Sequence, residues 1–245
     1  MTRMEVSLSP EHLDAAVFDL DGVLTDTAGL HEAAWKETFD AFLRQRRPPL
    51  ADFSQQDYRA FVDGRRREDG VRAFFASRGI ELPEGSESDP PDAETVQGLS
   101  RRKNEAVQER LRCDSAPLLG ARALLQALRR ADIRVAVASS SANAGAVLKA
   151  TGLDSFVQIR VDGVDSARLD LPSKPDPALF REALQRLEVE PTRAAIFEDA
   201  IAGVAAGRKA GFHTVIGVGR GQHAEALLAA GADMVVPDLS VVEVL

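Results

Sequence analysis

The chain of 245 residues carries a formal net charge of −8 and a single cysteine, Cys113. The acidic balance argues against a nucleic-acid partner, and one cysteine excludes a disulfide framework and a cysteine-based metal cluster. The composition, 44% hydrophobic and 28% charged, is typical of a globular enzyme with room for a core and a smaller companion domain. There is no membrane-spanning apolar run and no secretory signal, so we expect a cytoplasmic protein without a membrane partner.

The first predicted strand, Ala16–Leu20, ends on a pair of acids, Asp19 and Asp21. On an extended backbone, residues two positions apart share a face, so the strand end can aim both carboxylates into one pocket. Close like charges resist joint ionisation, and a shared proton or a hard cation such as Mg²⁺ would relieve the repulsion. The alternative at this point is a solvated turn rich in aspartate and glycine.

Residues from about 30 to 112 lack convincing buried strands and show helical spacing instead. Helices are predicted around His31–Phe42, Asp57–Val62, Arg67–Arg78 and Ala93–Leu111, with an acidic, proline-bearing loop at 82–92. We therefore expect a helical cap domain, 30–112, inserted into a core formed by 1–29 and 113–245. Because ligands bind beyond the carboxyl ends of parallel strands, this insert is expected to cover the acid pair.

The rest of the chain alternates apolar strands with helices, which predicts a doubly wound parallel α/β sheet. The further strands are expected at Ile133–Ser139, Ala194–Glu198, His213–Gly217 and Met234–Val236. The helices between them are expected at Ala121–Arg130, Asn143–Ala150, Pro177–Leu187, Gly203–Ala210 and Ala224–Ala230.

Three polar motifs follow these elements. The serine run 139–141 with Asn143 offers hydroxyls and backbone N–H groups at a strand-to-helix turn, which is either an anion site or a cap without a ligand. Lys174, just before a proline-started helix, can reach a phosphate, although most lysines are solvated. Glu198 and Asp199 end an apolar strand, where metal ligation is favoured over a helix N-cap.

These four motifs, in this order, resemble those of the haloacid dehalogenase superfamily of phosphotransferases. The resemblance implies that Asp19 attacks phosphorus to form an aspartyl phosphate, and that Asp21 acts as general acid and base. It implies that Ser139 binds the transferring phosphoryl group and that Lys174 stabilises the phosphorylated aspartate. It also implies an Mg²⁺ site formed by Asp19, the Asp21 backbone carbonyl, Glu198 and Asp199.

The cap narrows the resemblance to the β-phosphoglucomutase subfamily. Its hinge pattern matches Thr27, His31 and Trp35, its cap loop matches Gly64 and Arg67, and its R-K-N segment matches residues 102–104. Substrate contacts are thereby implied for Thr27, His31, Trp35, Gly64, Arg67, Lys103, Ser140, Ser141 and Asn143. Taken separately, the basic residues could be solvated helical faces, and His31 and Trp35 could pack the first cap helix. One departure is Ala142, where related mutases commonly carry lysine.

The resemblance implies a phosphosugar mutase that interconverts β-D-glucose 1-phosphate and D-glucose 6-phosphate through an aspartyl phosphate and glucose 1,6-bisphosphate. Such an enzyme needs two phosphate sites, with Arg67 serving the one in the cap. The alternative within the superfamily is an Mg²⁺-dependent sugar-phosphate phosphatase, which needs only one. A phospho-acceptor module resembling a signalling receiver domain is disfavoured by length and by the cap. A catalytically dead binding protein is disfavoured because each expected catalytic residue type is present. We expect a monomer that takes a small phosphosugar.

Overall fold

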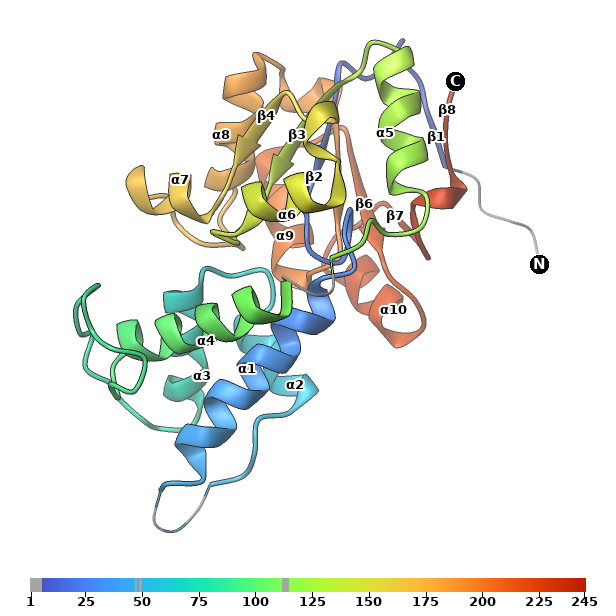
Figure 1. Ribbon diagram of the computed structural model, residues 1–245. Helices are drawn as coiled ribbons and strands as arrows, with labels where there is room; N and C mark the ends of the chain where they lie inside the picture. The colour runs from blue at the N-terminus through green and yellow to red at the C-terminus, as the bar shows by residue number, and fades with distance from the viewer. Residues whose placement is uncertain (1–5, 47, 49, 112–114) are drawn as a thin grey trace. The chain divides into compact units, whose positions relative to one another are not determined.

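The computed structural model describes residues 6–46, 48, 50–111 and 115–245 (Figure 1). The chain folds into two compact units, an α/β unit of residues 1–26 with 115–245 and a helical unit of residues 27–114. Cys113 and the expected core boundary at 112/113 lie outside the described residues, so the domain limits stay a prediction. None of the helices in the described ranges has both the length and the apolar character that a membrane crossing requires.

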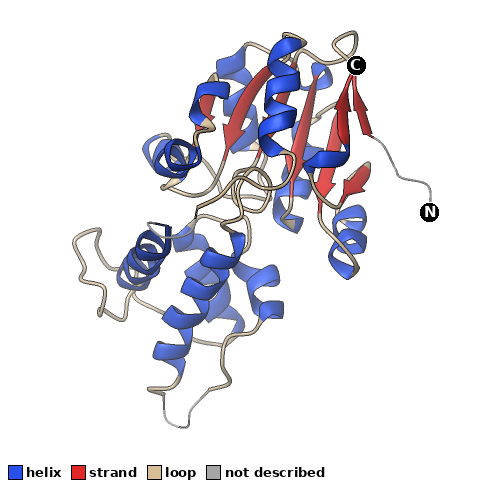
Figure 2. Ribbon diagram, turned by 45° about the vertical axis from the view of Figure 1, so that its right-hand side comes forward, coloured by secondary structure: helices blue, strands red, loops and turns tan. Residues whose placement is uncertain are grey.

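The α/β unit is built on six parallel strands, which Figure 2 shows side by side. They are β2 (Ala15–Phe18), β3 (Arg134–Ala138), β4 (Ile159–Val161), β5 (Ala194–Glu198), β6 (Thr214–Val218) and β7 (Met234–Val236), in the order β4-β3-β2-β5-β6-β7. The predicted α/β class is confirmed. Strand β2 pairs with β3 on one side and with β5 on the other. The carboxyl end of β2 is therefore the switch point of the strand order, where such sheets bind ligands.

Helices cover the sheet because its strands are apolar on both faces. Those of the unit are α5 (Ala121–Arg130), α6 (Ala144–Thr151), α7 (Gly163–Arg168), α8 (Ala178–Leu187), α9 (Ile201–Ala210) and α10 (Gln222–Ala229). Alternate residues of neighbouring strands, such as Val17 and Ile196, join one buried cluster with side chains of α8 and α9. This packing fixes the strand ends that carry the acidic motifs.

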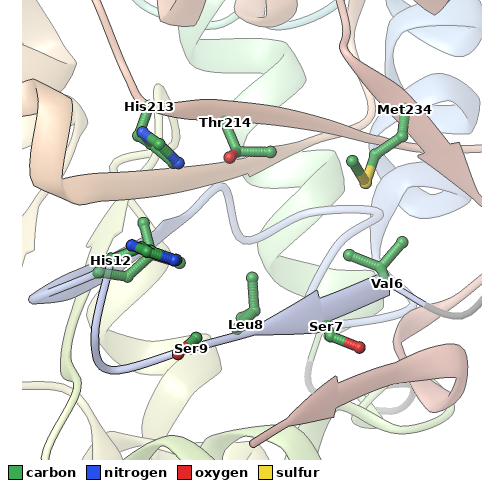
Figure 3. A pocket seen from close by; sticks show the side chains of 9 residues that line it. Val6, Ser7, Leu8, Ser9, His12, His213, Thr214 and Met234 are labelled. Atoms are coloured by element: carbon green, nitrogen blue, oxygen red, sulfur yellow. The ribbon is translucent and has the colours of Figure 1, made fainter.

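The edge strand β4 and the two strands of a second, smaller sheet were not predicted. Strand β1 (Val6–Leu8) pairs in parallel with β8 (Val242–Val244), and each is only three residues long. At the amino end of β6, His12 and His213 stack with ring centroids 6.5 Å apart beside a pocket of about 190 Å³ (Figure 3). Each of β1 and β8 has a polar residue at its centre, Ser7 or Glu243, so neither shows the apolar run by which the equally short β7 was predicted.

The helical unit consists of α1 (Ala28–Leu43), α2 (Gln55–Asp57) with a π-helical turn at Tyr58–Val62, α3 (Arg67–Ser77) and α4 (Val96–Leu111) (Figure 1). Its core is aromatic. The Phe39 ring lies 4.5 Å from the Phe74 ring and 5.1 Å from the Phe75 ring, measured between centroids. These contacts come from different helices, so they hold α1 against α3 and position the residues at the helix ends.

Candidate active site

Asp19 is the first residue after β2, at the switch point of the sheet. Its backbone N–H donates to the Phe197 carbonyl of β5 at 2.9 Å, and the residue is 7% exposed. The loop that follows closes on itself. The Thr25 hydroxyl donates to the Leu20 carbonyl at 3.1 Å, and the Gly22 N–H donates to the Thr25 carbonyl at 2.8 Å. Gly22 has φ +83°, which favours glycine, so Asp21 sits in a tightly defined turn.

Lys174 joins the acids of two strands. Its ammonium donates to Asp19 Oδ1 at 2.7 Å and to Glu198 Oε1, and the residue is 1% exposed. Burial raises the pKa of Asp19, and the charge of Asp21 raises it further. The charge of Lys174 acts in the opposite direction but does not outweigh burial. Burial likewise raises the pKa of Glu198 to about 7. Burial alone would lower the pKa of Lys174, but the two carboxylates raise it. The lysine is therefore charged.

Glu198 is fully buried, and both of its carboxylate oxygens have protein partners. Oε1 accepts from Lys174, and Oε2 accepts from the Ala200 backbone N–H at 2.8 Å. A Cβ at Gly203 would lie 1.8 Å from Oε1, so the glycine four residues after Asp199 leaves the space that this carboxylate occupies. The sequence pattern E-D-x-x-x-G thus has a steric cause.

The donors at this edge of the sheet suit a hard divalent cation. Asp19, Asp21 and Glu198 interact electrostatically around a single ammonium, which leaves an excess of negative charge. Carboxylate and carbonyl oxygens are the ligands that Mg²⁺ prefers. Within the described ranges, however, no three His, Cys, Asp or Glu side chains already converge as a ligand set. Glu198 instead faces Lys174. The Mg²⁺ assignment to Asp19, Asp21, Glu198 and Asp199 stays a prediction.

The serine loop after β3 is braced by hydrogen bonds to its own side chains. The Ser141 N–H donates to the Ser139 hydroxyl at 3.1 Å, and the Asn143 N–H donates to the Ser141 hydroxyl at 3.2 Å. The Gly163 N–H donates to the Ser141 carbonyl, and a Cβ at Gly163 would lie 2.7 Å from the Ser140 carbonyl oxygen. The sequence did not lead us to predict that the start of α7, after β4, packs against the serine loop. The signal was Gly163, which begins that helix directly after Asp162.

A second charged cluster lies in the helical unit. Lys103 of α4 is 3% exposed, its ammonium lies 2.9 Å from His31 Nδ1, and it sits 4.9 Å from the centroid of the Trp35 ring. An ammonium only donates, so Nδ1 accepts and Nε2 carries the proton. Burial, together with the charges of Lys103 and Arg67, holds the pKa of His31 well below its usual value. The imidazole is neutral.

Arg67, at the start of α3, belongs to the same cluster. Its Nη1 donates to Asn104 Oδ1, and its Nε lies 3.9 Å from Glu68 Oε1. Burial lowers the pKa of Arg67 against the raising effect of Glu68. Asn104 was not among the predicted site residues, although it ends the R-K-N segment that pointed to Lys103. Thr27 at the N-cap of α1 is buried, and Gly64 has φ +72°.

Comparison with known proteins places the chain in a family. Residues 13–211 match the haloacid dehalogenase-like hydrolase family. A β-phosphoglucomutase of Mycobacterium bovis is 50% identical over 97% of this chain and 94% of its own length. A phosphorylated carbohydrates phosphatase of Thermotoga maritima is 27% identical over 95% of this chain and 98% of its own length.

Among solved structures, a mutant of CbbY from Rhodobacter sphaeroides in complex with xylulose-(1,5)bisphosphate has a similar fold. It has a TM-score of 0.71 and 25% identity, over 93% of this chain and 95% of that chain. The family match covers most of the chain and most of the motifs described above, and the mutase relative extends over both units. The chain is therefore an enzyme of the haloacid dehalogenase superfamily and belongs to its β-phosphoglucomutase-like branch.

Proposed function

We propose that the protein interconverts β-D-glucose 1-phosphate and D-glucose 6-phosphate through an aspartyl phosphate and glucose 1,6-bisphosphate. The observation that carries the proposal is the cluster of the buried Lys103 with the half-buried Arg67 and the neutral His31, which the helical unit holds in addition to the acidic site of the α/β unit. A sugar bisphosphate carries two phosphates and needs two binding sites, whereas hydrolysis of a monophosphate needs one.

The α/β unit would carry the transfer chemistry. The Asp19 carboxylate attacks phosphorus, so that an Asp19 O–P bond forms as the bond to the sugar oxygen breaks. Asp21 gives its proton to the departing oxygen, and in the second half-reaction it takes a proton from the attacking hydroxyl. Lys174, which donates a hydrogen bond to Asp19, would offset the negative charge of the phosphorylated carboxyl. The hydroxyls of residues 139–141 and the Asn143 side chain would hold the phosphoryl oxygens.

A bound Mg²⁺, held by Asp19, the Asp21 carbonyl and Asp199 with Glu198 behind them, would neutralise charge on the transferring phosphoryl group. In the helical unit, Arg67 and Lys103 would bind the phosphate that is not being transferred. The neutral His31, which presents an N–H at Nε2, and the Trp35 ring would contact the sugar. Thr27 and Gly64 would shape this contact region.

The test supplies the purified protein with β-glucose 1-phosphate, Mg²⁺ and a trace of glucose 1,6-bisphosphate. Glucose 6-phosphate is measured with a coupled dehydrogenase and inorganic phosphate by a colorimetric assay. We expect glucose 6-phosphate as the main product, and none from Asp19→Asn, which keeps the shape but lacks the nucleophile. Arg67→Met should lose mutase turnover more than any residual phosphate release. A product that is only inorganic phosphate would contradict the proposal.

A sugar-phosphate phosphatase is the second candidate, because the relative from Thermotoga maritima carries that activity in its name. The same assay distinguishes the two reactions by their products. An aspartyl phosphate that meets water is hydrolysed, so the ratio of glucose 6-phosphate to inorganic phosphate measures how well the site excludes water during transfer.

A further inference from the structure

The peptide group between Asp199 and Ala200 is hydrogen-bonded through both its N–H and its carbonyl oxygen. Its N–H donates to Glu198 Oε2 at 2.8 Å, and its carbonyl oxygen lies 2.6 Å from Nε2 of His223 on α10. A peptide unit is planar, so fixing its two polar groups fixes the plane. The ψ angle of Asp199 is thereby set, and with it the direction in which the aspartate leaves β5.

The hydrogen bond assigns the donor nitrogen of His223. A carbonyl oxygen only accepts, so Nε2 must carry a proton and donate it to the Asp199 carbonyl. Nδ1 is buried and makes no hydrogen bond with any described residue. The half-buried imidazole thus makes one hydrogen bond, to the Asp199 carbonyl, while its second nitrogen has no hydrogen-bond partner among the described residues.

The neighbouring loop leaves room for this ring. A Cβ at Gly219, the residue after β6, would lie 3.0 Å from His223 Cδ2 and 3.1 Å from Leu227 Cδ1. His223, Gly219 and Asp199 all line one pocket of about 340 Å³ at the carboxyl ends of β5 and β6. The imidazole therefore links the loop after β6 to the acidic loop after β5.

We infer that His223 is a positioning residue, which aims Asp199 toward the cation by holding the Asp199 carbonyl. This rests on the proposed function, in which Asp199 is a ligand of Mg²⁺. His223 would act through the Asp199 peptide rather than by contact with the substrate or the ion. Groups that orient metal ligands typically change metal affinity 10–100-fold when they are removed.

The experiment measures Mg²⁺ binding to the metal-stripped full-length protein by calorimetry, without substrate. His223→Leu, which removes the donor, should raise the Mg²⁺ dissociation constant about tenfold or more. His223→Gln, whose amide N–H can occupy the place of Nε2, should restore most of the affinity. The melting temperature without metal should be similar in both variants, because a merely structural role would lower it in parallel with affinity. His213→Leu, at the stacked pair of Figure 3, is the matched histidine control and should bind Mg²⁺ like the wild type.

Gly219→Ala provides a second measurement that does not depend on His223→Leu folding. The added methyl pushes the imidazole by a few tenths of an ångström, so Mg²⁺ affinity should fall, but less than in His223→Leu. Wild-type affinity in a folded His223→Leu, or in Gly219→Ala if the leucine variant does not fold, would overturn the inference while leaving the proposed function intact. A wild-type protein that binds no Mg²⁺ would contradict both.

Discussion

Each unit of the molecule buries a lysine, and the two lysines have different surroundings. In the α/β unit, Lys174 lies between two carboxylates, those of Asp19 and Glu198. In the helical unit, Lys103 contacts a neutral imidazole, His31, and the face of Trp35. The acids outnumber the cation in the first cluster, and cationic and neutral groups prevail in the second. The first cluster therefore favours added positive charge, and the second favours an anion.

The comparison shows that burial alone does not say what a charged side chain does. A lysine buried between two carboxylates, as Lys174 is, joins the loop after β2 to β5 and orients the Asp19 carboxylate. A lysine buried against an imidazole and an indole ring, as Lys103 is, places its ammonium among basic and aromatic groups at a cost in desolvation. The following experiments test this difference, from the largest expected effect to the smallest.

Lys174→Met should have the largest effect on stability. Methionine fills the space but leaves Asp19 and Glu198 buried without their cation, which costs about 3–5 kcal/mol. Unfolding by urea, followed by circular dichroism, measures the loss, and turnover should disappear with it. Lys149→Met, at an exposed position on α6, is the control and should change stability by less than about 0.5 kcal/mol.

Lys103→Met should separate affinity from stability. His31 can lose one hydrogen bond at a cost of about 1 kcal/mol, so the unit should stay folded. The dissociation constant for glucose 1,6-bisphosphate should rise about tenfold or more, since a charge-assisted contact is lost. Trp35 is the only tryptophan in the chain, so its fluorescence reports both unfolding and binding. A destabilisation as large as that of Lys174→Met would remove the distinction between the two lysines.

Asn104→Asp should make the helical cluster resemble that of the α/β unit, because it places a carboxylate beside a cation. The new carboxylate would pair with Arg67 and stabilise the unit by about 1 kcal/mol, while competing with a bound phosphate. Asn104→Ala removes the acceptor and should weaken both stability and bisphosphate binding. If both variants shift the free energy of unfolding in the same direction, the neutral amide of Asn104 is not what lets the Arg67 charge bind a phosphate.

The pH dependence of the helical unit should show the smallest effect. The folded state keeps His31 neutral because its pKa is lowered, while in the unfolded chain it titrates near 6.5, so below that pH the unfolded state binds more protons. Stability contributed by this residue is therefore complete above pH 6.5 and is lost as the pH falls, by about 1 kcal/mol at pH 5.5. Unfolding followed by Trp35 fluorescence at pH 7.5 and 5.5 measures it. His31→Gln should remove this part of the slope.

The sequence predicted those parts of the site that depend on strand ends. Asp19 and Glu198 follow from apolar runs that stop at acids, and parallel strands bring such ends together. The resemblance implied that Lys174 serves Asp19, but its contact with Glu198 was not predicted, because Lys174 reaches both acids through a loop whose path depends on tertiary packing. The same holds for the pairing of Arg67 with Asn104, which are on different helices. Strand β4 was not predicted because its central residue is the exposed Arg160, which interrupts the apolar run.

The insertion of the helical unit between β2 and β3 has a consequence for synthesis. As the chain leaves the ribosome, β2 emerges first, and its neighbours β3 and β5 emerge only after the whole of α1 to α4. The helical unit is continuous in sequence, so its aromatic core can form while β2 still lacks both flanking strands. Asp19 can meet Lys174 and Glu198 only after the helical unit and β5 have been synthesised, so the acidic site forms after the aromatic core can.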